Sequence, residues 1–343
     1  MKQLLNTLFV TTQGSYLARK GDTVLVRVDG EDRLRVPIHT LGSIVCFGNV
    51  SASPFLMGLC GERNVALSFL TENGKFLARV HGPVAGNVLL RRQQYRMADC
   101  PATSAKIARS IIIAKIANSR NVLMRATRED AVCGHSKQTR HATSLLAQSL
   151  DGLTPRRSLD EIRGEEGQAA NIYFDVFDHL VTGNKQDFFL TNRNRRPPTD
   201  NLNALLSFLY TLLVHDVRSA LEAVGLDPAV GFLHRDRPGR ASLALDIAEE
   251  FRAYLADRLA LSLINRQQAK GSGFTKTESG AVTMDDATRK TVLVAWQKRK
   301  QDEIRHPFID EKVQVGLLPY VQAMLLARYI RGDLDGYPSF IWK

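Results

Sequence analysis

The stretch VALSFLTENGKFLARVHGPVAGNVLLRRQQYRMA, residues 65–98, holds the change from strand-like to helix-like sequence. Two β-rich runs flank Asn73-Gly74, a dipeptide that favours the positive φ angles of a tight hairpin turn. From Val88 onward, apolar residues recur with helical spacing, as in VLLRRQQYRMA. The stretch therefore predicts a boundary between a β-rich unit and a helical unit near residues 82–90.

The sequence is strand-like throughout on the N-terminal side of this boundary and helix-like on the C-terminal side. On the N-terminal side, TVLVRVDGEDRLRVPI at residues 23–38 is another pair of β-rich runs around Asp29-Gly30, and its alternation indicates one buried and one wet face. On the C-terminal side, helical spacing continues to about residue 330, with loops at 182–200 and 267–284. The predicted fold class is α+β, with a β-rich, sandwich-like N-terminal domain (or a small distorted barrel) followed by an all-α catalytic domain. The predicted domains are residues 1–86, residues 87–330, and a C-terminal tail, 331–343, which docks on the chain itself or on a partner.

The charge balance indicates an acidic partner. The 343 residues carry a net charge of +11, and such a surface attracts nucleic acid or anionic lipid, although many basic proteins bind neither. The four cysteines lack CxxC spacing, which excludes a zinc framework or a dense disulfide scaffold and favours free thiols in a reducing compartment. Apolar runs such as residues 204–214 are too short to span a bilayer, and the first residues predict a strand rather than a signal peptide. We therefore expect a cytoplasmic protein without a membrane segment.

An unusual group of acids lies in GFLHRDRPGRASLALDIAEEFRAYL, residues 231–255. On a helix, Asp246 is a neighbour of both Glu249 and Glu250, so the acids repel one another, and no basic residue follows any of them at four residues. One interpretation is a solvated acidic face near a helix N-terminus. The other is a bound divalent cation, Mn²⁺ or Mg²⁺, held by these carboxylates and by His234, which precedes Glu249 by 15 residues.

A further carboxylate ligand is available in RGEEGQAANIYF, residues 163–174. We expect Glu165 and Glu166 to stand at the start of a helix, where acids commonly do no more than stabilise the helix dipole. The small residues that follow, Gly167, Ala169 and Ala170, would let another helix and a bulky ligand approach closely.

Three blocks in order, GEEGQAANIYF, RPPTDNLNALLSFLYTLL and GFLH…SLALDIAEEFR, resemble the CRISPR-associated integrase/endonuclease family that inserts new spacers. The resemblance covers almost the whole chain, and the ending GYPSFIWK is similar to the subgroup found with type I-C systems. Carried over, the family's metal ligands and catalytic residues fall on Glu166, His234 and Glu249, with Asp246 as a secondary candidate.

The resemblance also implies an activity and partners. The family joins the 3′-hydroxyl of a short DNA to a phosphodiester of the CRISPR repeat, a transesterification assisted by Mn²⁺ or Mg²⁺, as part of antiviral defence. The implied partners are double-stranded DNA (prespacer and CRISPR repeat), a second copy forming a homodimer, a small ferredoxin-like CRISPR-associated adaptation partner and a prespacer-trimming nuclease.

Two basic segments are candidates for holding DNA. The candidate DNA-binding residues are Arg193, Arg195, Arg196, Arg235, Arg237 and Arg240, and a further basic patch is Lys298, Arg299 and Lys300. The competing hypotheses for the whole chain are a non-catalytic nucleic-acid-binding scaffold of a CRISPR complex and an RNA-processing nuclease.

Overall fold

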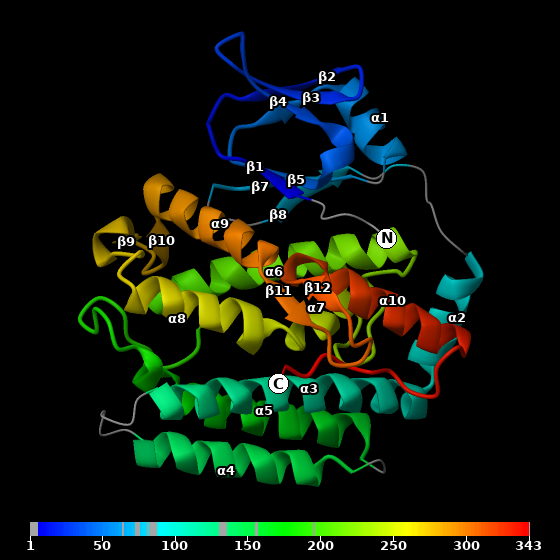
Figure 1. Ribbon diagram of the computed structural model, residues 1–343, viewed down its shortest axis with the longest axis vertical. Coiled ribbons are helices and arrows are strands. Elements are labelled where there is room, and N and C mark those ends of the chain that lie inside the picture. The colour runs from blue at the N-terminus through cyan, green and yellow to red at the C-terminus, as the bar shows by residue number, and fades with distance from the viewer. Residues whose placement is uncertain are drawn as a thin grey trace.

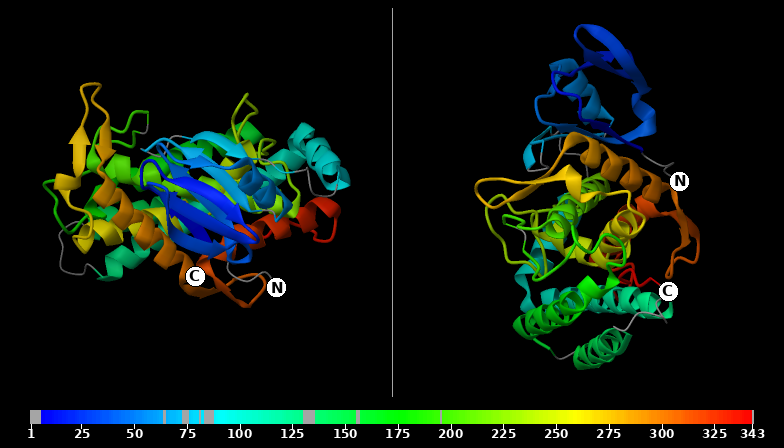
Figure 2. Two further views of the ribbon diagram at one scale, coloured as in Figure 1. Left: turned by 90° about the horizontal axis from the view of Figure 1, so that it is seen from above. Right: turned by 90° about the vertical axis from the view of Figure 1, so that its left-hand side faces the viewer.

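The computed structural model describes residues 6–63, 65–72, 76–80, 82, 88–129, 136–154, 157–194 and 196–342. A β-rich N-terminal part stands at one end of the molecule, and helices fill the rest (Figure 1). The view from the side shows the same separation (Figure 2). The α+β fold class predicted from the sequence is therefore confirmed.

The N-terminal elements are β1 (Asn6–Val10), β2 (Tyr16–Lys20), β3 (Thr23–Val28), β4 (Glu31–Pro37), β5 (Leu41–Phe47), β6 (Ser51–Ala52), α1 (Pro54–Glu62), β7 (Ala66–Leu70) and β8 (Phe76–Val80). The strands form two four-stranded sheets, ordered β1-β5-β7-β8 and β4-β3-β2-β6. Leu17, Ile44 and Leu67 from the two sheets share one core with Leu56 of α1. The region is therefore sandwich-like but not entirely β, because a helix completes its core.

The two dipeptides expected to form hairpin turns have different outcomes. Asp29 and Gly30 have φ angles of 54° and 82° and join β3 to β4, which pair in antiparallel fashion, so this prediction is confirmed. Asn73 and Gly74 lie outside the described residues, although β7 and β8 on either side of them pair antiparallel as expected.

Strand β5 joins the two parts of the molecule. Ile44 and Cys46 point into the N-terminal core, whereas Val45 and Phe47 belong to the large core that includes the helices. Strand geometry places alternate side chains on opposite faces, so an apolar residue at each of these positions buries the strand on both sides. The ring of Phe47 lies 6.0 Å from that of Phe208, centroid to centroid, and fixes the sheet against the helical part.

The helical part contains α2 (Val88–Asp99), α3 (Pro101–Glu129), α4 (Ser136–Gly152), α5 (Leu159–Asp175), α6 (Asn201–Val224), α7 (Ser242–Glu249), a π-helical turn (Arg252–Asp257), α8 (Arg258–Asn265), α9 (Asp286–Gln301) and α10 (Leu318–Arg331). Two small hairpins, β9 (Phe274–Lys276) with β10 (Val282–Met284) and β11 (Glu303–Arg305) with β12 (Lys312–Gln314), interrupt it. This part is therefore predominantly but not wholly α.

Helix α6 is the central helix of this part. Asp200 caps its first turn by accepting a hydrogen bond from Asn203, and Gly225, with φ at 95°, ends it. At 24 residues it is longer than the apolar run recognised in the sequence, and its length and composition would suffice to cross a membrane. However, 61 % of its apolar window is buried inside the protein, as in a core helix.

The C-terminal tail docks on its own chain, one of the two outcomes expected from the sequence. Tyr337 and Phe340 are buried, and both hydrogen-bond to the carboxylate of Glu250, through the Tyr337 hydroxyl at 2.7 Å and the Phe340 backbone N–H at 2.7 Å. Asn118 of α3 donates to the Glu250 and Phe340 carbonyls and accepts from the Trp342 N–H. The tail is therefore part of the packing around the residue that follows Glu249.

Candidate active site

Helix α7 turns its acidic side chains inward. Asp246, Glu249 and Glu250 are 0 %, 2 % and 0 % exposed. The interpretation of these residues as a solvated acidic face is therefore wrong. Charged carboxylates are costly to bury without partners, so each of them must be compensated by groups from elsewhere in the fold.

Asp246 organises the loop that carries His234. One carboxylate oxygen, Oδ2, accepts hydrogen bonds from the backbone N–H groups of Phe232 (2.6 Å) and Leu233 (2.9 Å). The other, Oδ1, accepts from the His234 backbone N–H at 3.0 Å and lies 2.6 Å from the ring atom Nδ1. An ionised carboxylate can only accept, which assigns the proton of the imidazole to Nδ1 and leaves the lone pair of Nε2 for a ligand. Asp246 therefore positions His234.

Glu249 is compensated by two basic side chains. Arg252 Nη1 lies 2.6 Å from Oε1, and Lys115 Nζ lies 2.8 Å from Oε2. Burial alone would raise the pKa of Glu249, but Arg252, Lys115 and His234 outweigh it and lower that pKa to about 2. Although Lys115 is close to Oε2, no described residue makes a well-aligned hydrogen bond to this buried oxygen.

Glu166 reaches the same ammonium group from α5. Lys115 Nζ donates a hydrogen bond to Glu166 Oε1. The expectation that Glu165 and Glu166 open their helix is wrong, because α5 begins at Leu159, where Ser158 and Glu161 form a capping box. Glu166 thus lies two turns inside the helix, on the face that packs against α3.

The structure brings the candidate ligands into one region, but not around one point. Glu166 and Glu249 meet at Lys115, and the imidazole of His234 is close enough to influence the charge of Glu249. Within the described ranges, no three His, Cys, Asp or Glu side chains form a ready-made metal cluster. Two carboxylates and an imidazole are nevertheless ligands that suit Mn²⁺ or Mg²⁺. In addition, the buried oxygen Oε2 of Glu249 accepts no well-aligned hydrogen bond from any described residue.

A hollow of about 370 Å³ is lined by Lys115, Glu166, Arg193, Tyr210 and Arg252, among others. Glu166 is the candidate ligand that lines it, whereas Glu249 and His234 do not. The guanidinium groups of Arg193 and Arg252 lie 5.1 Å and 4.9 Å from the centroid of the Tyr210 ring. Arg193, a candidate DNA-binding residue, thus faces the hollow. Two of these residues, Lys115 and Arg252, were missed in the sequence.

The other candidate DNA-binding arginines that the structure describes do not line this hollow. Arg235 is 72 % exposed and pairs with Asp160 at 3.3 Å, whereas Arg237 and Arg240 line a different cavity. Arg196 is exposed in the loop before α6, and Arg195 lies outside the described residues.

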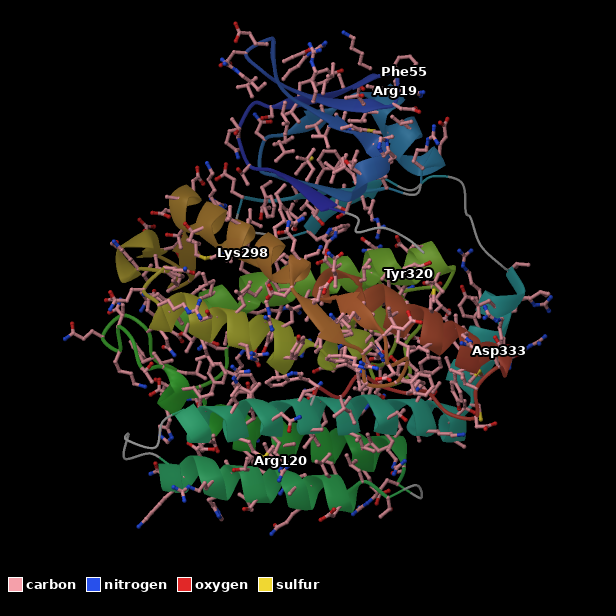
Figure 3. All side chains as sticks on the ribbon, viewed as in Figure 1. Arg19, Phe55, Arg120, Lys298, Tyr320 and Asp333 are labelled. Atoms are coloured by element: carbon pink, nitrogen blue, oxygen red, sulfur yellow. The ribbon has the colours of Figure 1, made fainter. Side chains whose placement is uncertain are left out.

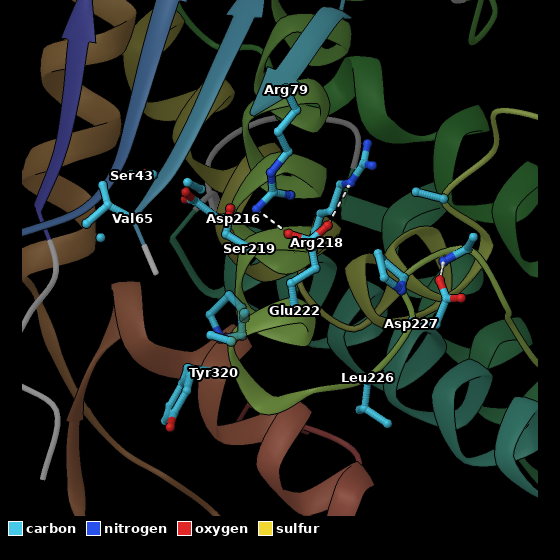
Figure 4. Close-up of a pocket in the computed structure, with 18 of the residues that line it drawn as sticks. Ser43, Val65, Arg79, Asp216, Arg218, Ser219, Glu222, Leu226, Asp227 and Tyr320 are labelled. Atoms are coloured by element: carbon cyan, nitrogen blue, oxygen red, sulfur yellow. Dashed lines mark hydrogen bonds and ion pairs between the residues drawn. The ribbon is translucent and has the colours of Figure 1, made fainter. Parts of the chain in front are cut away.

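That different cavity, of about 670 Å³, lies between the N-terminal sheet and helices α6 and α10 (Figure 4). Arg79 of β8 pairs there with Glu222, which Arg218 also approaches at 3.3 Å. None of the candidate metal ligands lines this cavity. It belongs to the junction between the two parts of the molecule rather than to the carboxylate site.

The basic patch expected on α9 is smaller than the sequence suggests. Lys298 is exposed on the surface (Figure 3). Lys300 is only 5 % exposed, because its ammonium group pairs with Asp216 at 2.9 Å and donates to Thr7 at 3.1 Å. Lys300 therefore attaches α9 to the N-terminal sheet and to α6, and including it in a surface patch was wrong.

Comparison with known proteins identifies the family. Residues 8–298 match the model of the family described as CRISPR associated protein Cas1. A relative from Chlorobaculum tepidum, named CRISPR-associated endonuclease Cas1 1, is 55 % identical over 343 residues, covering 100 % of both chains. The chain belongs to the Cas1 family.

One further relative and two solved structures also match. A Geobacter sulfurreducens protein named as a fusion of the exonuclease Cas4 and the endonuclease Cas1 is 34 % identical over 98 % of this chain and 60 % of its own length. A casposase bound to integration product has a TM-score of 0.83 at 22 % identity and covers 99 % of this chain and 95 % of its own. A chain from a Cas6-RT-Cas1–Cas2 complex has a TM-score of 0.81 at 22 % identity, over 99 % of this chain and 36 % of its own. The two structural likenesses establish a shared fold.

Proposed function

We propose that this protein is a metal-dependent DNA endonuclease and integrase that inserts short DNA segments into a CRISPR array as new spacers. The observation that carries this function is the convergence of Glu166 and Glu249, from separate helices, beside an imidazole oriented by Asp246. The relatives named as Cas1 endonucleases and the fold shared with a casposase bound to integration product support the same chemistry.

Glu166, Glu249 and His234 Nε2 would hold the cation, Mn²⁺ or Mg²⁺. When bound, such an ion polarises a phosphate oxygen and stabilises the oxygens that attack and leave in a transesterification. The protein's own residues prepare this site: Asp246 fixes the imidazole, and Arg252 fixes one oxygen of Glu249.

The partners follow from the family and the charge. We propose double-stranded DNA, both prespacer and CRISPR repeat, as substrate, because the net charge of +11 favours a polyanion. Arg193, in the hollow that Glu166 also lines, is placed to contact a phosphate. The relatives in a Cas1–Cas2 complex and in a Cas4/Cas1 fusion support a small ferredoxin-like partner and a trimming nuclease. We also propose that the protein forms a homodimer, acts in the cytoplasm and belongs to the type I-C subgroup.

Single alanine substitutions at Glu166, His234 and Glu249 test the function. Each is expected to abolish Mn²⁺- or Mg²⁺-dependent strand transfer into a branched DNA substrate while leaving DNA binding intact, since none of them is a basic contact to DNA. Full activity in a variant would remove that residue from the site.

The competing functions predict different results. If the chain were a non-catalytic scaffold, its thermal stability would not respond to Mn²⁺ or to EDTA. If it were an RNA-processing nuclease, it would cleave RNA in preference to branched DNA.

A further inference from the structure

Lys115 places one positive charge between the two proposed carboxylate ligands. Its side chain leaves α3, is only 14 % exposed, and brings Nζ to Glu249 Oε2 at 2.8 Å and into a hydrogen bond with Glu166 Oε1. Because α3 packs directly against α5 and α7, which carry these acids, the backbone holds the ammonium group within reach of both.

The two carboxylate oxygens of Glu249 contact two different basic side chains. Arg252 follows three residues later along the same helical segment and holds Oε1 at 2.6 Å. Lys115 comes from another helix and approaches Oε2 without the alignment of a good hydrogen bond. Oε2 and Glu166 Oε1 are thus bound by the same ammonium group, and Oε1 of Glu249 is held independently.

We propose that the ammonium group of Lys115 competes with the divalent cation for Glu166 and for Oε2 of Glu249. This inference rests on the proposed function. Binding of the cation displaces the ammonium group from both oxygens, while Arg252 remains on Oε1. Lys115 thereby sets the cation concentration at which the site fills.

The chemistry of the residue suits this exchange. The buried carboxylate of Glu249 beside the partly exposed carboxylate of Glu166 would be unfavourable without a counter-charge, so the ammonium group allows the helices to pack before a cation arrives. Lysine carries a compact charge on a flexible stem, whereas the planar fork of an arginine would be held more firmly by two carboxylates.

The test compares Lys115→Met with Lys106→Met, a matched loss of charge at an exposed position of the same helix α3. Isothermal titration with Mn²⁺ alone should show binding roughly 10-fold tighter or more in Lys115→Met than in the unmodified protein, from release of the competing ion pair. Lys106→Met should bind as the unmodified protein does. Without Mn²⁺, Lys115→Met should also melt at a lower temperature, and Mn²⁺ should restore it.

The outcomes separate this inference from the function on which it rests. If the unmodified protein binds Mn²⁺ and Lys115→Met binds no more tightly, the competition does not exist and only the role of Lys115 is overturned. If neither protein binds Mn²⁺, or if Glu166→Gln binds it undiminished, the proposed metal site falls and this inference with it. Should Lys115→Met fail to fold, Lys115→Gln, which keeps a polar group on the helix, gives the same comparison.

Discussion

Replacing Asp246 by asparagine tests how the imidazole of His234 is prepared. The carboxylate accepts four hydrogen bonds at 2.6–3.0 Å, two at each oxygen, from three backbone N–H groups and one ring nitrogen. An amide keeps one accepting oxygen and turns an NH₂ group toward the other two partners. The NH₂ group should face His234, because its ring nitrogen can become an acceptor whereas the backbone N–H groups of Phe232 and Leu233 cannot. Each hydrogen bond to a charged group contributes about 1.5–3 kcal/mol, so losing the one from the His234 backbone N–H should lower the free energy of unfolding by about 1.5–3 kcal/mol.

The same substitution should change the chemistry of the ring. An NH₂ group facing Nδ1 donates rather than accepts, so the proton of His234 should move to Nε2, the atom proposed to bind the cation. Affinity for Mn²⁺ and strand transfer should then fall by roughly 10- to 100-fold, as for other residues that orient metal ligands.

Three measurements check this prediction. Urea unfolding gives the stability, histidine ¹⁵N NMR of the metal-free protein gives the tautomer, and calorimetry gives the affinity for Mn²⁺. Asp236→Asn, an equal change of charge at an exposed position of the same loop, is the control and should behave as the unmodified protein. An Asp246→Asn protein that keeps the proton on Nδ1 and binds Mn²⁺ normally would refute the positioning role.

Two further predictions concern stability. Phe340→Ala should lower the free energy of unfolding by about 3–5 kcal/mol, because this fully buried ring packs 5.4 Å from the ring of Phe251 and 5.3 Å from that of Tyr254. Phe55 is 77 % exposed, so Phe55→Ala should lower it by less than about 0.5 kcal/mol. Urea unfolding of the two variants checks the difference. Burial lowers the pKa of His215 to about 4, so below pH 6.5 the unfolded chain takes up a proton that the folded protein resists, and stability should fall by about 3 kcal/mol by pH 4. His215→Gln should remove that part of the pH dependence in unfolding curves, and an unchanged dependence would contradict the assignment.

Local sequence patterns were sufficient for most of the fold. The Asp29-Gly30 turn and the onset of helical spacing at Val88 act over a few residues, and the structure has both. Helix α1 had a readable signal that was overlooked, since Ser53 caps it and Pro54 occupies its first position. The early start of α5 was likewise encoded in its capping box.

The site was only partly accessible from the sequence. Acids without basic neighbours at four residues left two interpretations open, and their burial excludes the solvated face. The nearby partner of Glu249, Arg252, lies at three residues rather than four. Lys115 is 134 positions before Glu249, on a helix with an ordinary core pattern, and only tertiary packing brings it to the acids. Spacing along one chain segment carries no information about such a contact.

The docked tail has a consequence for synthesis of the protein. A ribosome releases residues 337–342 after every other described element, yet these residues donate two of the hydrogen bonds to the Glu250 carboxylate and pack against Tyr254. Until they emerge, the segment bearing Glu249 lacks part of its packing. A nascent chain that stops short of Tyr337 therefore leaves the carboxylate of Glu250, next to a proposed metal ligand, without two of its hydrogen bonds.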